Sequence, residues 1–373
     1  MANNNENKIL NVPHLRFPEF SGKWKKCTLG DITINFNLRN KEKIELPMYS
    51  VTNNRGFIPQ SEQFEDRDMV GEDIKAYKII HNKDFAYNPA RINVGSIAKY
   101  NGSKPCMISS LYVCFKAANG IDEDWLMHLL RSPKIQYYYN INGEGGVRIY
   151  LFYPNFARIR TSFPTIAEQR KIANLLSLLD ARITTQNKII EKLESLIKGI
   201  AQNVARNNKP NIRLSECLEY SSSTLQESDV CENGTYPVYG ANGIVGSIDN
   251  YNTEKEAVYM IKDGSGVGTV SYVTGKCSAT GTLNTLQAKE GYSLQYLYYM
   301  LKVFNFEPYK TGMAIPHIYF KDYGKAKIFC PSYTEQLKYV ELLSAIDNKL
   351  SAEQSILTDL SLQKQYLLSQ MFI

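Results

Sequence analysis

An internal repeat at an offset of 167 residues limits the possible architectures of this chain more than any other feature of its sequence. Residues 164–171 read Pro-Thr-Ile-Ala-Glu-Gln-Arg-Lys, and residues 331–338 read Pro-Ser-Tyr-Thr-Glu-Gln-Leu-Lys. The register continues without a gap, so that Leu193 matches Leu360. Repeats of this kind correspond to repeated structural units. We therefore predict two half-repeats, each a globular region followed by a helix, although the globular regions share little sequence.

The repeated segments have the heptad pattern of coiled-coil helices. Each begins after a proline with Glu-Gln in its first turn, where the helix dipole favours acidic groups. Apolar residues then recur at two positions of a seven-residue period, which is a narrower stripe than that of an ordinary surface helix. The predicted seam residues are Ile172, Leu176, Leu179, Ile183, Ile190 and Leu193 in the first helix and Leu343, Ile346, Leu350, Leu357 and Leu360 in the second.

One polar residue interrupts each seam at the same repeat position, Gln186 in the first helix and Glu353 in the second. Two equivalent helices pack most simply in an antiparallel coiled coil about a pseudo-twofold axis. Gln186 and Glu353 would then lie close together and fix the register. The alternative is two separate helices on separate cores, which would leave these residues far apart. Helices of about 40 residues extend roughly 60 Å, enough to hold two globular regions apart.

The globular regions are predicted to be mixed and rich in strands, which gives an α+β fold class. Apolar runs at Ile44–Val51, Lys78–Tyr87 and Ala257–Lys262 read as strands, and helices are expected at 122–131 and 294–304. An Asn-rich start without the apolar core of a signal peptide predicts a disordered tail and a cytoplasmic protein. The predicted divisions are a tail at 1–12, globular regions at 13–162 and 206–328, and helices at 163–205 and 329–373.

Several classes of function lack support in the sequence. No apolar run reaches the ~18 residues that span a bilayer. Seven dispersed cysteines without a CxxC pair, and four dispersed histidines, predict neither disulfides nor a metal site. The glycine-rich stretch at 264–268 is not followed by Gly-Lys-Ser/Thr. Residues 88–91, Asn-Pro-Ala-Arg, lack the second proline and the aromatic residue of an amino-methyltransferase motif. We therefore expect no catalytic residues, cofactor or metal in this chain.

Loops that combine glycine with polar and basic residues are candidates for binding nucleic acid. Asn and Arg can read adenine and guanine edges with paired hydrogen bonds, and Lys and glycine amides suit phosphate. Residues 13–162 carry 21 Lys+Arg against 15 Asp+Glu, whereas residues 206–328 carry 12 of each, so contacts in the second region depend on local placement. These loops could also be simple turns. The candidates are Asn53, Asn54, Arg55, Asn88, Arg91, Lys99, Arg148 and Tyr150 in the first region and Tyr239, Asn242, Lys262, Ser265 and His317 in the second.

Together these features resemble the specificity subunit of Type I restriction-modification systems, over essentially the whole chain from Val12. The duplicated Pro-x-x-x-Glu-Gln-x-Lys segments carry most of the resemblance. Further matches are the opening Pro-His-Leu-Arg-Phe-Pro-Glu-Phe at 13–20, Trp24, Leu-Gly-Asp at 29–31, and Tyr-Pro-Val-Tyr-Gly-Ala-Asn-Gly at 236–243. The family's recognition domains are variable, so its DNA contacts do not transfer position by position.

The resemblance implies that two target-recognition domains each read one half of a split site in double-stranded DNA, while the helices set the distance between the halves. It also implies methyltransferase (modification) subunits, two in number, that methylate adenine with S-adenosylmethionine. A restriction subunit would add translocation and cleavage with ATP and Mg²⁺. These cofactors would belong to the partners, and no membrane is involved.

Two other functions remain open at this point. The chain could be a scaffold whose coiled coil joins proteins without touching DNA, although the basic first region argues against it. It could also be a self-contained methyltransferase, which the missing cofactor loop and incomplete motif disfavour.

Overall fold

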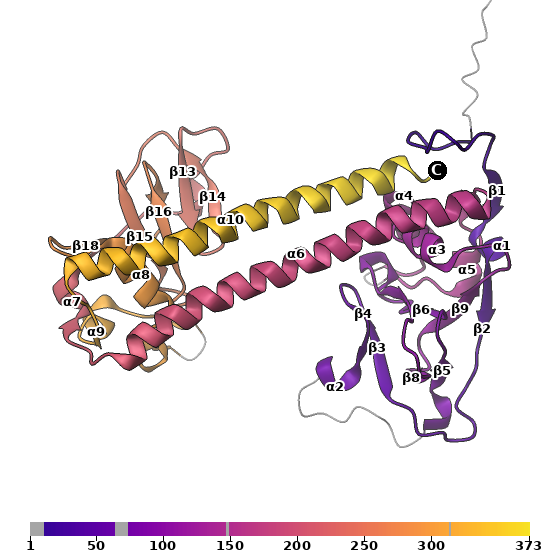
Figure 1. The fold of residues 1–373 in the computed structure, drawn as a ribbon, viewed down its shortest axis with the longest axis horizontal. Coiled ribbons are helices and arrows are strands. Elements are labelled where there is room, and N and C mark those ends of the chain that lie inside the picture. Colours follow the sequence, from indigo (N-terminus) through magenta and orange to yellow (C-terminus); the bar gives the residue numbers. More distant parts are fainter. Residues whose placement is uncertain (1–10, 64–73, 147–148, 313–314) are drawn as a thin grey trace, which may run out of the picture. The chain divides into compact units, whose positions relative to one another are not determined.

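The computed structural model describes residues 11–63, 74–146, 149–312 and 315–373. The chain divides into two compact units. Unit 1 comprises Met1–Thr185 and Leu357–Ile373, and unit 2 comprises Gln186–Ile356. Each unit thus contains one globular region, part of the first long helix and part of the second (Figure 1).

Unit 1 contains two four-stranded sheets and one two-stranded ribbon. The ribbon pairs β1 (Lys25–Thr28) with β10 (Arg160–Phe163). The first sheet has the order β2 (Thr33–Phe36), β9 (Val113–Ala117), β6 (Phe85–Tyr87) and β7 (Ile97–Lys99). The second has the order β4 (Gly56–Pro59), β3 (Met48–Thr52), β8 (Cys106–Ile108) and β5 (Lys78–Ile80). Short helices complete the unit: α1 (Leu29–Ile32), α2 (Gln60–Gln63), α3 (Glu123–Leu130), α4 (Pro133–Asn142) and α5 (Tyr153–Ala157).

Unit 2 repeats this plan with different residues. A ribbon pairs β11 (Ile212–Arg213) with β19 (Lys327–Ile328). The four-stranded sheet has the order β12 (Leu218–Ser222), β18 (Leu283–Ala288), β15 (Glu256–Ile261) and β16 (Val270–Thr274). The smaller sheet has the order β14 (Gly243–Ile248), β13 (Tyr236–Gly240) and β17 (Ser278–Ala279). The helices are α7 (Leu214–Cys217), α8 (Leu294–Lys302) and α9 (Phe320–Tyr323).

The two units share one strand topology. The order β2-β9-β6-β7 of unit 1 corresponds to the order β12-β18-β15-β16 of unit 2. Counted along the chain, each sheet places its first strand at one edge, followed by the fourth, the second and the third, and all neighbours pair antiparallel. In the second sheets, hairpin β3–β4 with parallel β8 corresponds to hairpin β13–β14 with parallel β17. In the described part of unit 2, the counterpart of β5 is reduced to a single antiparallel bridge between Thr253 and Cys277, next to β17. The repeat therefore extends through the globular regions, where the sequences are dissimilar.

The long helices α6 (Ile166–Asn207) and α10 (Tyr333–Gln370) begin 167 residues apart, as the repeat predicts. In unit 2 the buried Gln186 amide donates to the backbone carbonyl of Glu353 at 2.9 Å and to its side-chain carboxylate. In unit 1 the Lys364 ammonium pairs with Asp180. Later residues of α10 meet earlier residues of α6, so the predicted antiparallel pairing and the central Gln186–Glu353 contact are confirmed (Figure 1).

The seam residues differ in burial along the helices. Leu176 and Leu343 are fully buried, and six others are also in or near the core: Ile172, Leu179, Ile190, Leu350, Leu360 and Ile197. Ile183, Leu193, Ile346 and Leu357 are partly exposed. In unit 1 the end of α10 reaches the main core, where Phe372 lies 6.0 Å from the ring of Trp125.

Several strand predictions need correction. Lys78–Tyr87 was expected to form one strand, but it forms β5 and β6, which belong to different sheets. A turn separates them because the His81 backbone N–H donates to the Asp84 carboxylate at 2.8 Å and Lys83 adopts φ 71°. The strand expected at 44–51 begins only at Met48, after Pro47, which lacks a backbone donor. Asn11, expected in the tail, accepts a hydrogen bond from the Trp24 backbone N–H at 2.8 Å, whereas residues 1–10 lie outside the described chain.

Candidate nucleic-acid interface

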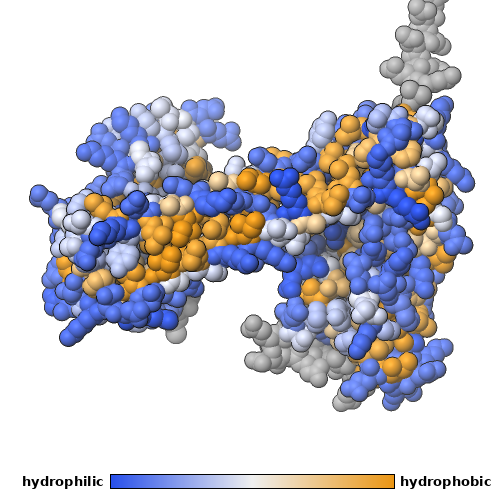
Figure 2. All heavy atoms as spheres, viewed as in Figure 1, coloured by the Kyte–Doolittle hydropathy of each residue, from blue (hydrophilic) through white to orange (hydrophobic). Residues whose placement is uncertain are grey.

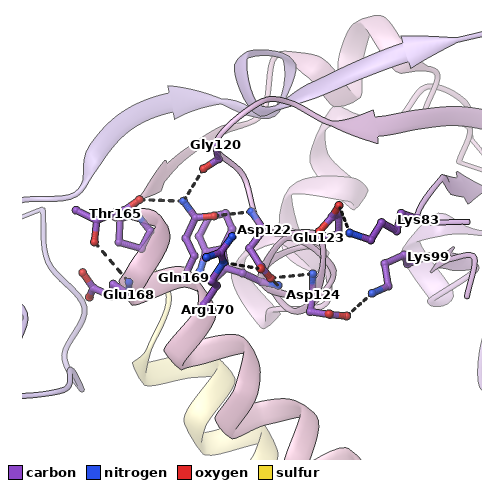
Figure 3. Close-up of polar contacts among 12 residues, drawn as sticks. Lys83, Lys99, Gly120, Asp122, Glu123, Asp124, Thr165, Glu168, Gln169 and Arg170 are labelled. Carbon is purple, nitrogen blue, oxygen red and sulfur yellow. Dashed lines mark hydrogen bonds and ion pairs between the residues drawn. The ribbon is translucent and has the colours of Figure 1, made fainter.

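A buried glutamine joins each long helix to its globular region. The Gln169 side-chain oxygen accepts from the Asp122 N–H at 2.8 Å, and its amide donates to the carbonyls of Pro164 at 3.0 Å and Gly120 at 3.3 Å (Figure 3). Asp122 is the N-cap of α3. The repeated glutamine therefore fixes the start of α6 against the start of α3.

Gln336 makes the same joint in unit 2. Its oxygen accepts from the N–H of Ser293, the N-cap of α8, at 2.9 Å, and its amide donates to the Pro331 carbonyl at 2.9 Å. Both glutamines are at most 1% exposed, so the joint is buried in each unit. It attaches each long helix to the start of α3 or α8 in its own unit.

The loops of unit 1 bring five of the candidate DNA contacts together. The β3–β4 turn supplies Asn53, Asn54 and Arg55, and the β6–β7 loop supplies Asn88 and Arg91. These side chains line one hollow of about 500 Å³. Its other walls come from β3, from Gln60, and from the turn between β8 and β9.

Hydrogen bonds hold these two loops against each other. The Ser96 hydroxyl donates to the Val51 carbonyl at 2.7 Å, which ties the β6–β7 loop to β3. The Asn88 side-chain oxygen accepts from the Ala90 N–H at 3.0 Å and so shapes its own turn. Arg91 is exposed. The exposed Arg55 pairs with Glu62 at 2.7 Å, an interaction that water and salt weaken.

The remaining candidates of unit 1 are placed differently. Lys99 lines a neighbouring hollow of about 600 Å³, but its ammonium pairs with Asp124 (Figure 3). The Tyr150 ring is 39% exposed and stacks on Phe152 at 6.2 Å. Arg148 lies outside the described residues. Tyr150 is therefore more accessible to a ligand than Lys99, whose side chain is 12% exposed.

Unit 2 places its candidates on the equivalent loops. Asn242 lies in the β13–β14 turn and is exposed, while Tyr239, at the end of β13, packs on Tyr259 at 5.5 Å. Lys262 and the exposed Ser265 lie in the β15–β16 loop. His317 approaches this loop, and its Nδ1 lies 2.6 Å from the Asp263 carboxylate. Lys262, Ser265 and His317 are therefore brought to one place.

A third loop follows the repeat in both units. Backbone pairing between Glu144 and Tyr150 in unit 1 corresponds to pairing between Thr311 and His317 in unit 2, each 167 residues further on. The residue after each pair, Leu151 in unit 1 and Ile318 in unit 2, makes an equivalent backbone hydrogen bond to the β6–β7 loop and the β15–β16 loop, respectively. The Leu151 N–H donates to the Pro89 carbonyl at 3.0 Å, and the Ile318 N–H donates to the Lys262 carbonyl at 3.0 Å.

Sequence reasoning missed several residues around these loops. Ser109, Leu111 and Tyr112 line the hollow of unit 1 from the β8–β9 turn. Lys302, Asn305 and Lys310 line a hollow of about 340 Å³ beside the β15–β16 loop of unit 2. The β8–β9 turn contains no Gly, Asn or basic residue to mark it. Lys302 belongs to α8, and no pattern along the chain places it next to a distant loop.

Comparison with known proteins bears directly on this arrangement. Residues 208–361 match the family model for the Type I restriction modification DNA specificity domain. A Mycoplasma genitalium protein named as a type I specificity subunit is 27% identical over 55% of this chain. Residues 208–361 thus carry the DNA specificity domain of this family, and about half of the chain is similar in sequence to Type I specificity subunits. The alignments cover only 59% of that Mycoplasma specificity subunit, 32% of one from Haemophilus influenzae and 29% of the EcoprrI specificity subunit from Escherichia coli.

Solved specificity subunits share the fold. The crystal structure of a Type I S subunit from M. genitalium superposes with a TM-score of 0.65 at 16% identity, covering 97% of this chain and 99% of that one. A chain from a structure of the type I restriction-modification system gives a TM-score of 0.54 at 17% identity over 93% of this chain. The chain therefore has the fold of the M. genitalium S subunit in both half-repeats, although the family model matches only the second.

The long helices of the chain also expose apolar side chains. Ile189 and Leu196 on α6 and Leu342 and Ile356 on α10 are 37–51% exposed within unit 2. Apolar surface along these helices is visible in Figure 2. Beside it lies a hollow of about 460 Å³, lined by Ile197, Leu350, Val303 and charged residues from α8 and α10. A surface of this kind suits a protein partner.

The titratable groups give no sign of an activated nucleophile. Burial raises the pKa of Cys106 and Cys114 to about 12, so both thiols stay protonated at neutral pH. Burial also lowers the pKa of His128 to about 4. Among the described residues, no group of three or more His, Cys, Asp or Glu could hold a metal ion. No helix in the described ranges is long and apolar enough to cross a membrane.

Proposed function

We propose that this chain is a Type I specificity subunit and reads a two-part site in double-stranded DNA, with the loops of unit 1 contacting one half-site and the loops of unit 2 the other. The observation that carries the proposal is the equivalence of the loops. The β3–β4 and β6–β7 loops of unit 1 correspond to the β13–β14 and β15–β16 loops of unit 2, and the backbone pair Glu144–Tyr150 corresponds to Thr311–His317. Two domains that recognise different DNA sequences require the same fold with different side chains on equivalent loops.

The side chains have the chemistry for this task. In unit 1 the exposed Arg91 can bind the O6 and N7 of guanine, and Asn53 and Asn54 can bind the N6 and N7 of adenine. In unit 2 Lys262 suits phosphate or guanine, while Asn242 and Ser265 supply neutral donors and acceptors. Each unit thus offers a cationic candidate, Arg91 or Lys262, together with neutral donors and acceptors.

The antiparallel helices would act as the spacer between the half-sites. Reading two places on one face of B-DNA requires about 34–36 Å, one helical turn, between them. The Gln186–Glu353 contact supports this role because it fixes the register of the two helices at their common repeat position.

Partner subunits would supply the chemistry. We infer that the exposed apolar side chains of α6 and α10 bind modification subunits, two of them in keeping with the repeat, and that a restriction subunit joins the complex. S-adenosylmethionine, ATP and Mg²⁺ would be bound by these partners, so that the specificity subunit itself would not be an enzyme. A complex that modifies chromosomal DNA would act in the cytoplasm.

Single-molecule sequencing of methylated adenines in the source genome, with and without this gene, tests the proposal. We expect a two-part motif with a fixed gap to lose its methylation when the gene is deleted. Unchanged methylation in a strain whose modification subunits are active would overturn the proposal. Co-purification of those subunits with a chain that leaves methylation unchanged would favour a scaffold that does not read DNA.

A further inference from the structure

Leu111 is an exposed apolar side chain in the unit 1 hollow, whose lining combines the polar candidates with Met48, Tyr49 and Val51. It is 78% exposed, the highest value among the large apolar side chains that the described residues leave exposed. It lies at the tip of the β8–β9 turn and lines the same hollow as Asn53, Asn88 and Arg91. Single exposed leucines are common on protein surfaces, so its position within this hollow is what matters.

The backbone around Leu111 is held in place. The Tyr112 N–H donates to the Ser109 carbonyl at 3.2 Å and closes the turn. The Tyr112 hydroxyl accepts from the Val51 N–H at 3.2 Å, and the Lys78 ammonium donates to the Tyr112 carbonyl at 2.6 Å. Because Val51 belongs to β3, the turn is fixed to the strand that leads into Asn53. Leu111 therefore has a defined place beside the polar candidates and gains no burial from folding.

The fold itself does not require an apolar residue at this turn. The equivalent turn of unit 2, between β17 and β18, consists of Thr280, Gly281 and Thr282. The hydroxyls of Thr280 and Thr282 lie 2.8 Å apart. The same frame thus carries an outward leucine in unit 1 and small polar residues in unit 2, which is the pattern expected of a residue that distinguishes the two half-sites.

We propose that Leu111 contacts the C5 methyl group of a thymine in the first half-site. This inference rests on the proposed DNA-reading function. The C5 methyl is the apolar group that thymine presents in the major groove, and apolar side chains are its usual partners. The neighbouring Arg91 and Asn53 can read guanine and adenine edges in the same groove. Leu111 therefore supplies the one kind of base contact that the polar residues of the hollow cannot make.

Replacing thymine by deoxyuridine tests this contact, because it removes the methyl group and leaves base pairing intact. The full chain with its modification subunits is titrated with duplexes of the mapped site, in which each thymine of the first half-site is replaced in turn. We expect one replacement to weaken binding about 4-fold, the loss of one buried methyl at ~0.8 kcal/mol. Leu111→Ala should lower affinity for the thymine duplex by at least as much and should be insensitive to that replacement.

The matched control is Ile34→Ala, which shortens an apolar side chain that is 54% exposed in unit 1 but does not line the hollow. This variant should bind like the wild type and keep its sensitivity to deoxyuridine. Replacements in the second half-site should affect wild type and Leu111→Ala equally. The inference is overturned if the first half-site contains no thymine, if no replacement weakens wild-type binding, or if Leu111→Ala keeps the full sensitivity. In each case specific binding of the two-part site persists, whereas its absence would mean that the proposed function itself fails.

Discussion

Glu168 in unit 1 and Glu335 in unit 2 occupy the same position of the repeat, yet they have different partners. Glu168 is 1% exposed, accepts two hydrogen bonds of 2.7 Å from the Arg16 guanidinium, and accepts a third from the Trp24 indole at 3.2 Å. Glu335 is exposed and accepts hydrogen bonds only locally, from the hydroxyl and backbone of Ser332 at 2.8 and 3.3 Å.

The neighbouring glutamines, in contrast, make the same joint in both units. The comparison teaches that the repeated Glu-Gln pair has two separate roles. The glutamine attaches the helix to its globular region in each half-repeat. The glutamate of unit 2 caps its helix through Ser332, whereas the glutamate of unit 1 anchors the segment that begins at Pro13. The predictions below test this difference between the units, from the largest expected effect to the smallest.

Replacing the two glutamates should have unequal consequences. Glu168→Gln leaves a largely buried Arg16 without its counter-charge, which should destabilise unit 1 by about 3 kcal/mol. Glu335→Gln weakens an exposed cap and should cost about 1 kcal/mol or less. Both tryptophans, Trp24 and Trp125, lie in unit 1. Urea unfolding followed by tryptophan fluorescence therefore reports unit 1, and hydrogen exchange read by mass spectrometry reports both units. Equal losses in the two units would refute the asymmetry.

Acid should destabilise unit 1 selectively. His128 is buried in unit 1, and burial lowers its pKa to about 4 from an ordinary value near 6.5. The unfolded chain therefore binds a proton that the folded chain does not. Neutral His128 therefore contributes roughly 2–3 kcal/mol to the stability of unit 1 above pH 6.5, and this contribution is lost as the pH falls from about 6.5 to 4. In unit 2, the corresponding aromatic-rich helix α8 has Tyr299 at this position, with its hydroxyl 3.2 Å from the Asp347 carboxylate. The tyrosine hydroxyl stays protonated across this pH range.

The variant His128→Gln should remove most of this pH dependence from the unit 1 unfolding midpoint and leave unit 2 unchanged. Ser177 provides a partner for the new amide, because its hydroxyl lies 3.2 Å from the His128 Nε2. A unit 1 midpoint that depends on pH as steeply in the variant as in the wild type would assign the effect to other groups.

The shared joint should be equally important on both sides. Gln169→Ala and Gln336→Ala each leave a buried helix N-cap amide without its acceptor, at a cost of about 2 kcal/mol. Each change should lower the stability of its own unit only, as read by unit-resolved hydrogen exchange. A substitution that destabilised both units equally would show that the stability of each unit also depends on the joint in the other unit.

The sequence allowed the helical frame to be predicted well, because heptads and a 167-residue offset are local or periodic signals. It placed Gln186 beside Glu353 from symmetry alone. It could not show that β2-β9-β6-β7 and β12-β18-β15-β16 share an order, since strand pairing joins segments far apart in dissimilar sequences. It also joined β5 and β6 into one strand, because the turn at His81–Asp84 contains neither Gly nor Pro.

For the candidate site, composition pointed to loops that the fold brings together, but not to the partners of each side chain. Gly, Asn and Arg marked the β3–β4 and β6–β7 loops of unit 1. The pairing of Lys99 with Asp124 depends on tertiary contact with α3, which no local pattern reveals. Leucine is not among the residue types by which DNA-binding candidates were selected, so Leu111 was identified only by its high exposure inside the hollow.

The smallest expected effect, and the one that separates the units by function, concerns single base contacts. Arg91→Ala should weaken binding to the first half-site about 10-fold, since a paired contact to guanine contributes ~1–3 kcal/mol. Ser265→Ala should weaken binding to the second half-site by a few-fold, because a neutral hydroxyl makes a weaker contact. Duplexes with one half-site scrambled at a time, titrated with the full chain and its modification subunits, measure each effect. If Arg91→Ala affected both half-sites equally, Arg91 would bind phosphate without reading sequence, and the division of the DNA between the two units would have to be tested through other residues.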